Sequence, residues 1–149
     1  MAFFTVAGSV WSITAISASS CATEAGGVLL GRHLRDGSAI IVDAVTTPMA
    51  GDRRGRTRFH RAQRRHQELI DQAWRDSDGT CTYLGEWHTH PEPVPTPSQI
   101  DWADWRRLRS DRYTEPLFFV IVGTQEMCAW EGWRMGLIRS LRALSHEPG

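Results

Sequence analysis

The stretch that most constrains the fold of this chain covers residues 85–105 and reads GEWHTHPEPVPTPSQIDWADW. Aromatic and small residues favour a strand over residues 83–90, and residues two apart on a strand face the same side. His88 and His90 are therefore expected to point together. Four prolines follow within the next seven residues. Because proline fixes φ and removes a backbone donor, this segment is predicted to be a stiff loop.

Ser98 begins an amphipathic run over residues 98–112, which predicts a helix with Asp101 in its first turn. From that position the carboxylate can turn back toward the two histidines. Two imidazoles and one carboxylate form an open zinc site with water in the fourth position, and zinc lowers the pKa of such a water from about 15.7 to about 7. The pattern therefore indicates hydrolase chemistry.

Each part of this pattern also has a simpler interpretation. Ser98 and Asp101 fit a capping box at a helix start, and a His-x-His pair in a strand is more often two polar edge residues. A capping box, however, needs no histidine pair upstream. A histidine pair likewise needs no stiff loop leading to a serine and an aspartate. The combination favours the metal site.

The order His-x-His-Pro, six further residues and Ser-x-x-Asp resembles the signature of the JAMM (MPN-domain) metalloproteases. Known members mostly cleave isopeptide or peptide bonds after the C-terminus of ubiquitin or a ubiquitin-like protein. The segment EAGGVLLG, beginning at Glu24, is similar to the glutamate-containing early strand of that family. The resemblance implies a zinc ion held by His88, His90 and Asp101. It also implies that Glu24 is the general base and proton shuttle, and that Ser98 donates to the tetrahedral oxyanion.

The residues in and around the motif, GEWHTHP and PTPS, are most similar to those of a small stand-alone bacterial branch of the family. This branch is found in mobile elements and CBASS antiphage operons. There, a JAMM protease removes a cyclic-oligonucleotide synthase from the targets to which an E1/E2-like partner attached it. The resemblance therefore implies a ubiquitin-like protein or a conjugated target protein as partner. Three alternatives stay open: processing of a small sulfur-carrier ubiquitin-like protein, a non-catalytic MPN scaffold, and a nucleic-acid-associated protein.

The length of 149 residues, 41% of them hydrophobic, predicts one domain over residues 1–149 with its own core. The resemblance implies an α/β fold like that of JAMM/MPN domains and cytidine deaminases, with a mixed sheet flanked by helices on both sides. Besides residues 83–90, strands are expected near residues 3–6, 24–34, 38–46, 117–122 and 125–133. The segments 24–34 and 38–46 are expected to form a hairpin joined by Asp36-Gly37, and residues 125–133 to pair with residues 117–122. Residues 137–144 fit a last strand or a helix, and the strand is favoured. Helices are expected near residues 10–16, 62–76 and 98–112, and Trp102 and Trp105, three residues apart in the last of these, are expected to pack together. The middle helix is predicted to cover the sheet with Leu69, Ile70, Ala73 and Trp74.

Seven arginines lie within residues 53–65. Such a segment can bind phosphates, but the net charge of the chain is zero and aromatic residues are sparse among the arginines, which argues against nucleic acid. A loop that faces an acidic partner tail is the other interpretation.

The cysteines and the N-terminus indicate where the protein works. Three widely spaced cysteines without a C-x-x-C motif suggest neither a disulfide framework nor a cysteine zinc site, and they fit a reducing cytoplasm. Residues 1–22 lack the basic n-region of a secretory signal. No stretch of the sequence approaches the roughly 18 apolar residues of a membrane span. A cytoplasmic protein that does not enter the membrane is expected.

Overall fold

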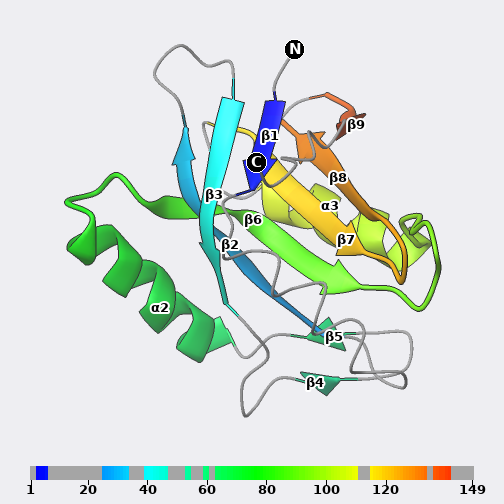
Figure 1. The fold of residues 1–149 in the computed structure, drawn as a ribbon, viewed down its shortest axis with the longest axis horizontal. Helices are drawn as coiled ribbons and strands as arrows, with labels where there is room; N and C mark the ends of the chain where they lie inside the picture. Colours follow the sequence, from blue (N-terminus) through cyan, green and yellow to red (C-terminus); the bar gives the residue numbers. More distant parts are fainter. Residues whose placement is uncertain are drawn as a thin grey trace.

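A mixed β-sheet forms the centre of the fold in the computed structural model (Figure 1). The structure describes residues 3–6, 25–33, 39–46, 53–54, 59–60, 63–110, 115–133 and 136–141. Within them, the sheet has seven strands in the order β1-β3-β2-β6-β7-β8-β9. Their bounds are β1 Phe3–Val6, β2 Gly26–His33, β3 Ala39–Val45, β6 Thr82–Thr89, β7 Leu117–Val122, β8 Met127–Gly132 and β9 Ile138–Leu141. A separate two-stranded pair joins β4 (Arg53–Arg54) to β5 (Phe59–His60).

The strand pairings explain how distant segments meet. The β1–β3 and β6–β7 pairs are parallel, and the β2–β3, β2–β6, β7–β8 and β8–β9 pairs are antiparallel. The predicted hairpin of β2 with β3, the predicted pairing of β7 with β8 and the predicted last strand are confirmed. The turn predicted to join β2 to β3 and the helix predicted near residues 10–16 lie outside the described residues.

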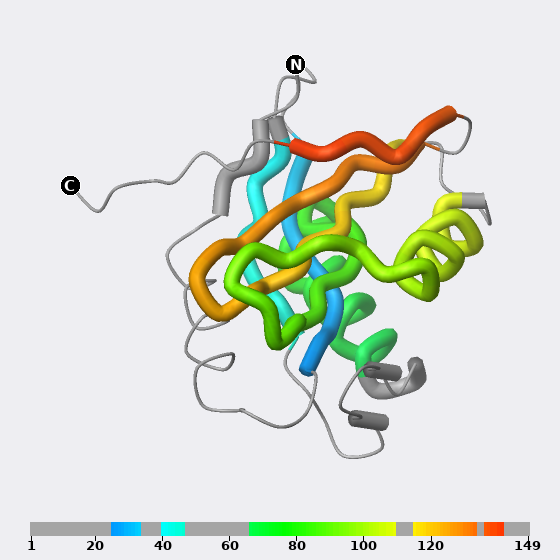
Figure 2. Tube along the Cα trace, turned by 90° about the vertical axis from the view of Figure 1, so that its right-hand side faces the viewer, coloured from blue at the N-terminus to red at the C-terminus, as the bar shows by residue number. Residues whose placement is uncertain are grey.

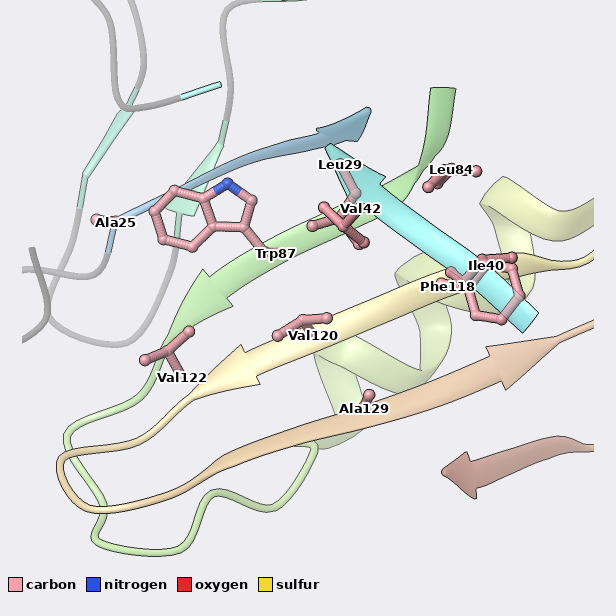
Figure 3. Packing of buried hydrophobic residues seen from close by; sticks show 10 residues of the cluster. All are labelled: Ala25, Leu29, Ile40, Val42, Leu84, Trp87, Phe118, Val120, Val122 and Ala129. Atoms are coloured by element: carbon pink, nitrogen blue, oxygen red, sulfur yellow. The ribbon is translucent and has the colours of Figure 1, made fainter. Parts of the chain in front are cut away.

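Strand β7 is buried on both faces, as its continuous apolar sequence predicts. Successive side chains of a strand point to opposite faces. On one face Phe118, Val120 and Val122 pack with Trp87 and other buried residues (Figure 3). On the other face Leu117, Phe119 and Ile121 pack with aromatic residues that include Trp105. The sheet therefore has a hydrophobic core on each side.

Two helices flank the sheet within the described residues: α2 (Gln63–Asp76) and α3 (Gln99–Ser110). The predicted α/β class, a mixed sheet with flanking helices, is confirmed. Figure 2 shows α3 in yellow-green beside the strands. Trp105 of α3 stacks on Phe119 with ring centroids 4.7 Å apart, and Trp102 packs edge-on against Trp105 at 5.4 Å. This aromatic packing fixes α3 on the sheet, and it confirms the predicted contact between the two tryptophans.

Helix α2 contacts β2 and β6, as predicted, but two of the four side chains predicted to cover the sheet are exposed. Leu69 is 42% exposed and Trp74 is 53% exposed, whereas His66 is fully buried. The His66 ring is held by Thr46, whose Oγ1 lies 2.6 Å from Nδ1. The prediction that Leu69 and Trp74 are buried against the sheet is therefore wrong. The first part of the helix instead buries His66, which contacts Thr46.

Two further predictions concern the cysteines and the membrane. Cys81 and Cys128 are free thiols, in line with the absence of a disulfide framework, and Cys21 lies outside the described residues. None of the described helices is both long and apolar enough to cross a membrane.

Candidate metal centre

Strand β6 lies in the middle of the sheet and places the two histidines at its C-terminal end. His88 pairs in register with Gly26 of β2 on one side and Ile121 of β7 on the other. Its ring faces α3, with a centroid 6.4 Å from that of Trp105. His90 follows the end of β6, where its main-chain N donates to the carbonyl of Val122. The two imidazole centroids are 4.9 Å apart, so the prediction that the histidines point together is confirmed.

Asp101 closes the group from the first turn of α3. Its Oδ1 lies 3.1 Å from His88 Nε2, and its Oδ2 lies 3.2 Å from His90 Nε2. The two Nε2 atoms are themselves 3.1 Å apart. Three side chains from a strand end and a helix start therefore present one atom each to a common point, and these atoms could hold a metal ion.

The first turn of α3 is also a capping box. Ser98 N donates to Asp101 Oδ2 at 2.7 Å, and Asp101 N donates to Ser98 Oγ at 3.1 Å. These are the reciprocal bonds that satisfy two orphan donors at a helix N-terminus. The two interpretations of Ser98 and Asp101 are therefore compatible, because the cap holds the carboxylate in the position from which it reaches both histidines.

The surroundings of Asp101 favour its ionised form. Burial raises the pKa of the Asp101 carboxyl, but hydrogen bonds with His88 and His90, the nearby charge of His88 and the bond from Ser98 N together hold that pKa well below its usual range. Asp101 is therefore a carboxylate at neutral pH, which is the form that binds a metal ion.

The loop between the histidines and α3 is fixed by the turn that joins β7 to β8. Thr124 N donates to the carbonyl of Glu92 at 2.7 Å, and the N–H groups of Gln125 and Glu126 both donate to the carbonyl of Pro93. Figure 2 shows this loop, in green, beside the orange β7–β8 turn. The stiffness predicted from the prolines is thus supplemented by contacts from another part of the chain.

Sequence reasoning missed Glu92, which stands two residues after His90 within that loop. Its Oε1 lies 3.0 Å from His90 Nδ1, the ring nitrogen that does not face Asp101. The sequence does show a carboxylate two residues after the second histidine, close enough along the chain to contact it. The sequence could not show that the loop turns this side chain back onto the ring.

Glu24, the predicted general base, lies outside the described residues, and its role stays a prediction. The described chain resumes at Ala25, which exchanges two hydrogen bonds with Thr89: Ala25 N donates to Thr89 Oγ1 and Thr89 N donates to the carbonyl of Ala25, both at 2.9 Å. Thr89 is the residue between the two histidines. The main chain next to Glu24 is therefore held at the end of β6 that carries the two histidines.

The donor set fits zinc in chemistry and in spacing. Ligand atoms bound at about 2.0–2.1 Å in tetrahedral geometry lie about 3.3 Å from one another. His88 Nε2 and His90 Nε2 lie 3.1 Å apart, and they lie 3.1 Å and 3.2 Å from the two different oxygens of Asp101, which is close to this spacing. Two imidazoles and a carboxylate are also the ligands of open catalytic zinc sites.

Comparison with known proteins gives one family and several relatives. Residues 10–135 match the profile of the prokaryotic homologs of the JAB domain. Proteins named CD-NTase/cGAS isopeptidase are similar to this chain: that of Pseudomonas aeruginosa is 41% identical over 109 residues, and that of Vibrio cholerae is 42% identical over 110 residues. These matches cover 72% and 73% of this chain and 68% and 66% of the relatives.

Two more distant similarities are to a metalloprotease and to a solved structure. A probable metalloprotease of Sinorhizobium fredii is 28% identical over 130 residues, which are 83% of this chain and 76% of that protein. The solution structure of a protein from Desulfitobacterium hafniense superposes with a TM-score of 0.64 at 22% identity, covering 97% of this chain and 92% of the other. The structural likeness concerns the fold.

Proposed function

This chain belongs to the prokaryotic homologues of the JAB domain and is a JAMM-type metallopeptidase, and on that premise we propose that it is a zinc-dependent isopeptidase acting on conjugated CD-NTases. The observation that carries the proposal is the convergence of His88, His90 and Asp101 at the spacing of zinc ligands. The names of the relatives in Pseudomonas aeruginosa, Escherichia coli and Vibrio cholerae support the isopeptidase activity.

His88, His90 and Asp101 are the proposed ligands. When bound, zinc supplies a Lewis acid that polarises a carbonyl group and lowers the pKa of water. The side chains of this chain supply the orientation: β6 aligns the two rings, and the capping box with Ser98 fixes the Asp101 carboxylate. A site held in this way before the metal arrives needs little rearrangement to bind it.

Glu24 is the proposed base. Its neighbour Ala25 is bonded to Thr89, between the two histidine ligands, which supports a place beside the metal. In the proposed reaction Glu24 takes a proton from water, the water oxygen bonds to the carbonyl carbon, and the C–N bond breaks. Glu24 then returns the proton to the leaving amine. One water molecule is consumed, and the products are a carboxylate and a protonated amine, which together hold both hydrogens of the water.

Ser98 is the proposed donor to the oxyanion that forms when the carbonyl carbon is attacked. Its Oγ accepts a hydrogen bond from Asp101 N, so the hydroxyl hydrogen remains for donation to the substrate. The side chain is exposed beside the ligands, where a substrate can reach it. One such donor contributes about 10²- to 10³-fold to the rate.

The proposed substrate is an isopeptide bond between the C-terminus of a CD-NTase and an amine of a target protein, as in CBASS regulation. An E1/E2-like enzyme would form that bond, and this protein would reverse the reaction. The relatives are named CD-NTase/cGAS isopeptidases, which supports a CD-NTase as the conjugated protein, and they match over about two thirds of their own length. Processing of a small ubiquitin-like protein is the alternative that the same site chemistry would serve.

The test is cleavage of a panel of reporters, each joined by an isopeptide bond to the C-terminus of a CD-NTase or of a small ubiquitin-like protein. We expect cleavage at the CD-NTase junction that is abolished by a zinc chelator. Glu24→Ala should keep one zinc per chain and lower kcat/KM by about 10²- to 10⁴-fold, because a positioned general base contributes that much.

The matched control is Glu126→Ala, which removes the same charge from an exposed side chain in the β7–β8 turn. It should cleave at the wild-type rate. A Glu24→Ala protein as fast as the wild type would refute the role of Glu24. A zinc-loaded protein that cleaves only the ubiquitin-like fusion would refute the proposed substrate, and one that cleaves neither would refute the proposed reaction.

A further inference from the structure

Glu92 contacts the ring of His90 from the side opposite the ligand cluster. Its Oε1 is 3.0 Å from His90 Nδ1, while His90 Nε2 faces Asp101 Oδ2 at 3.2 Å. The His90 side chain is only 8% exposed, and that of Glu92 is 44% exposed. The imidazole is thus held between two carboxylates, one at each nitrogen.

The two carboxylates have different consequences for the ring. An ionised carboxylate only accepts hydrogen bonds, and a neutral imidazole has one N–H and one bare nitrogen. A hydrogen bond to Glu92 therefore requires the proton on Nδ1. That tautomer leaves a lone pair on Nε2, the atom that faces the cluster. In the metal-free protein Asp101 Oδ2 also accepts from Nε2, so the two carboxylates compete for the ring proton, and Glu92 favours the tautomer in which Nε2 can bind a cation.

We propose that Glu92 is a positioning residue that fixes the tautomer and orientation of His90 for metal binding. This inference rests on the proposed metal site and deepens it. Metal-binding histidines generally donate their second N–H to a partner of this kind, and loss of that partner typically lowers metal affinity about 10- to 100-fold. Glu92 is the partner that this chain provides for His90.

The main chain around Glu92 is held firmly enough for this task. The carbonyl of Glu92 accepts a bond from Thr124 N, and the next carbonyl, of Pro93, accepts two more from the β7–β8 turn. Gly123 lies so close that a Cβ there would be 2.6 Å from the carbonyl oxygen of Glu92. The two flanking residues are Pro91 and Pro93, each with a fixed φ. The backbone that carries the carboxylate therefore has little freedom to leave the ring.

A simpler interpretation is that Glu92 and His90 form a surface ion pair without a role, since exposed pairs contribute only about 0–1 kcal/mol. The two interpretations differ in what they predict. An incidental pair would affect neither the tautomer of a ring nor the affinity for a metal. A positioning residue would affect both, and an uncharged side chain that can still accept the hydrogen bond should restore much of the effect.

The experiment compares the wild type with Glu92→Ala, Glu92→Gln and the control Glu126→Ala. Zinc affinity is measured by competition with a chromogenic chelator. We expect Glu92→Ala to bind zinc about 10- to 100-fold more weakly. Glu92→Gln should recover most of the affinity, because its amide oxygen also accepts from Nδ1–H. Glu126→Ala should bind like the wild type.

The second measurement is the nitrogen NMR shift of the His90 ring in the metal-free protein at about pH 8.5, where an ordinary imidazole is neutral, with Asp101→Ala introduced into every protein compared. Without that change Asp101 Oδ2, 3.2 Å from His90 Nε2, competes with Glu92 for the ring proton. On this background the proteins with Glu92 or Glu92→Gln should carry the proton on Nδ1, and Glu92→Ala should shift it toward Nε2. Neither readout depends on cleavage, so a failure here is distinct from a failure of the proposed reaction.

Three outcomes would overturn the inference. If Glu92→Ala keeps the wild-type zinc affinity and the Nδ1–H tautomer, Glu92 does not position the ring. If Glu126→Ala weakens zinc binding as much as Glu92→Ala does, the effect is that of a nearby charge and the hydrogen bond is not its source. Should Glu92→Ala fail to fold, Glu92→Gln with wild-type affinity but an Nε2–H ring would also refute the proposal.

Discussion

The replacement of Gly123 by alanine tests whether the β7–β8 turn holds the loop of residues 91–98, between His90 and α3, in place. A Cβ at this position would lie 2.6 Å from the Glu92 carbonyl oxygen, 2.7 Å from Pro95 Cδ and 2.8 Å from the Pro93 carbonyl oxygen. Separations below 3.0 Å are essentially never adopted by real Cβ atoms. Two of the three obstructing atoms belong to the main chain, and the third to a proline ring, so no flexible side chain can yield. The loop itself must move.

The magnitude follows from the cost of overpacking, which is about 1–3 kcal/mol for an added carbon in a well-packed region. For a chain of this size each kcal/mol lowers Tm by about 2–4 °C, so we expect the metal-free Gly123→Ala protein to melt about 2–12 °C below the wild type. Displacement of the loop also moves Glu92 away from His90. Zinc affinity should therefore fall together with Tm.

The assay is thermal unfolding followed by circular dichroism, together with the zinc competition titration. Gly132→Ala is the matched control in the same hairpin, because its Cβ would meet only side-chain atoms, the nearest being Phe119 Cε2 at 3.3 Å. This control should lose less stability and keep its zinc affinity. If Gly123→Ala melts like the wild type, or no lower than Gly132→Ala, the turn does not hold the loop.

Three further predictions follow from the same contacts. Zinc at 100 times its Kd should raise the free energy of unfolding by about 2.7 kcal/mol, and His88→Ala should abolish the accompanying rise in Tm; a rise of equal size in the variant would place the metal elsewhere. Because the pKa of Asp101 is depressed in the folded state, its stabilising effect is present above its ordinary pKa of about 3.9 and is lost as pH falls below it. Urea titrations of the metal-free protein should therefore show a smaller loss of stability in acid for Asp101→Asn than for the wild type, and equal losses would contradict this reasoning. Thr46→Val removes the Oγ1 atom that pairs with buried His66 and accepts from Val28 N, and should cost about 1–3 kcal/mol of unfolding free energy in urea; a neutral effect would show that water replaces the hydroxyl.

Local sequence patterns were sufficient to predict that His88, His90 and Asp101 lie together. The period of two along β6 put His88 and His90 on one face, and the helix start at Ser98 put Asp101 in the first turn. All three residues lie within one short stretch of chain, so few non-local contacts decide whether they meet. The capping box is an alternative interpretation of Ser98 and Asp101, and the structure has the capping box together with the contacts of Asp101 to both histidines, because one carboxylate has enough lone pairs for both.

Contacts between distant parts of the chain were not predictable in the same way. The hold of the β7–β8 turn on Glu92 depends on the parallel pairing of β6 with β7, which no local pattern specifies. The orientation of α2 was misjudged for a related reason. Its apolar residues Leu69 and Trp74 suggested a buried side, but the hydrogen bond of His66 to Thr46, twenty residues earlier, decides how the helix begins.

The short proline-rich connection between His90 and Asp101 has a consequence for the unfolded chain. Joining two points of a flexible chain costs about (3/2)RT ln n in conformational entropy, which is about 2 kcal/mol for the 11 residue steps between positions 90 and 101. Four prolines reduce that cost further, because they already restrict the conformations that closure would remove. His90 and Asp101 therefore lose less conformational entropy when they come together than two side chains from distant parts of the chain would lose.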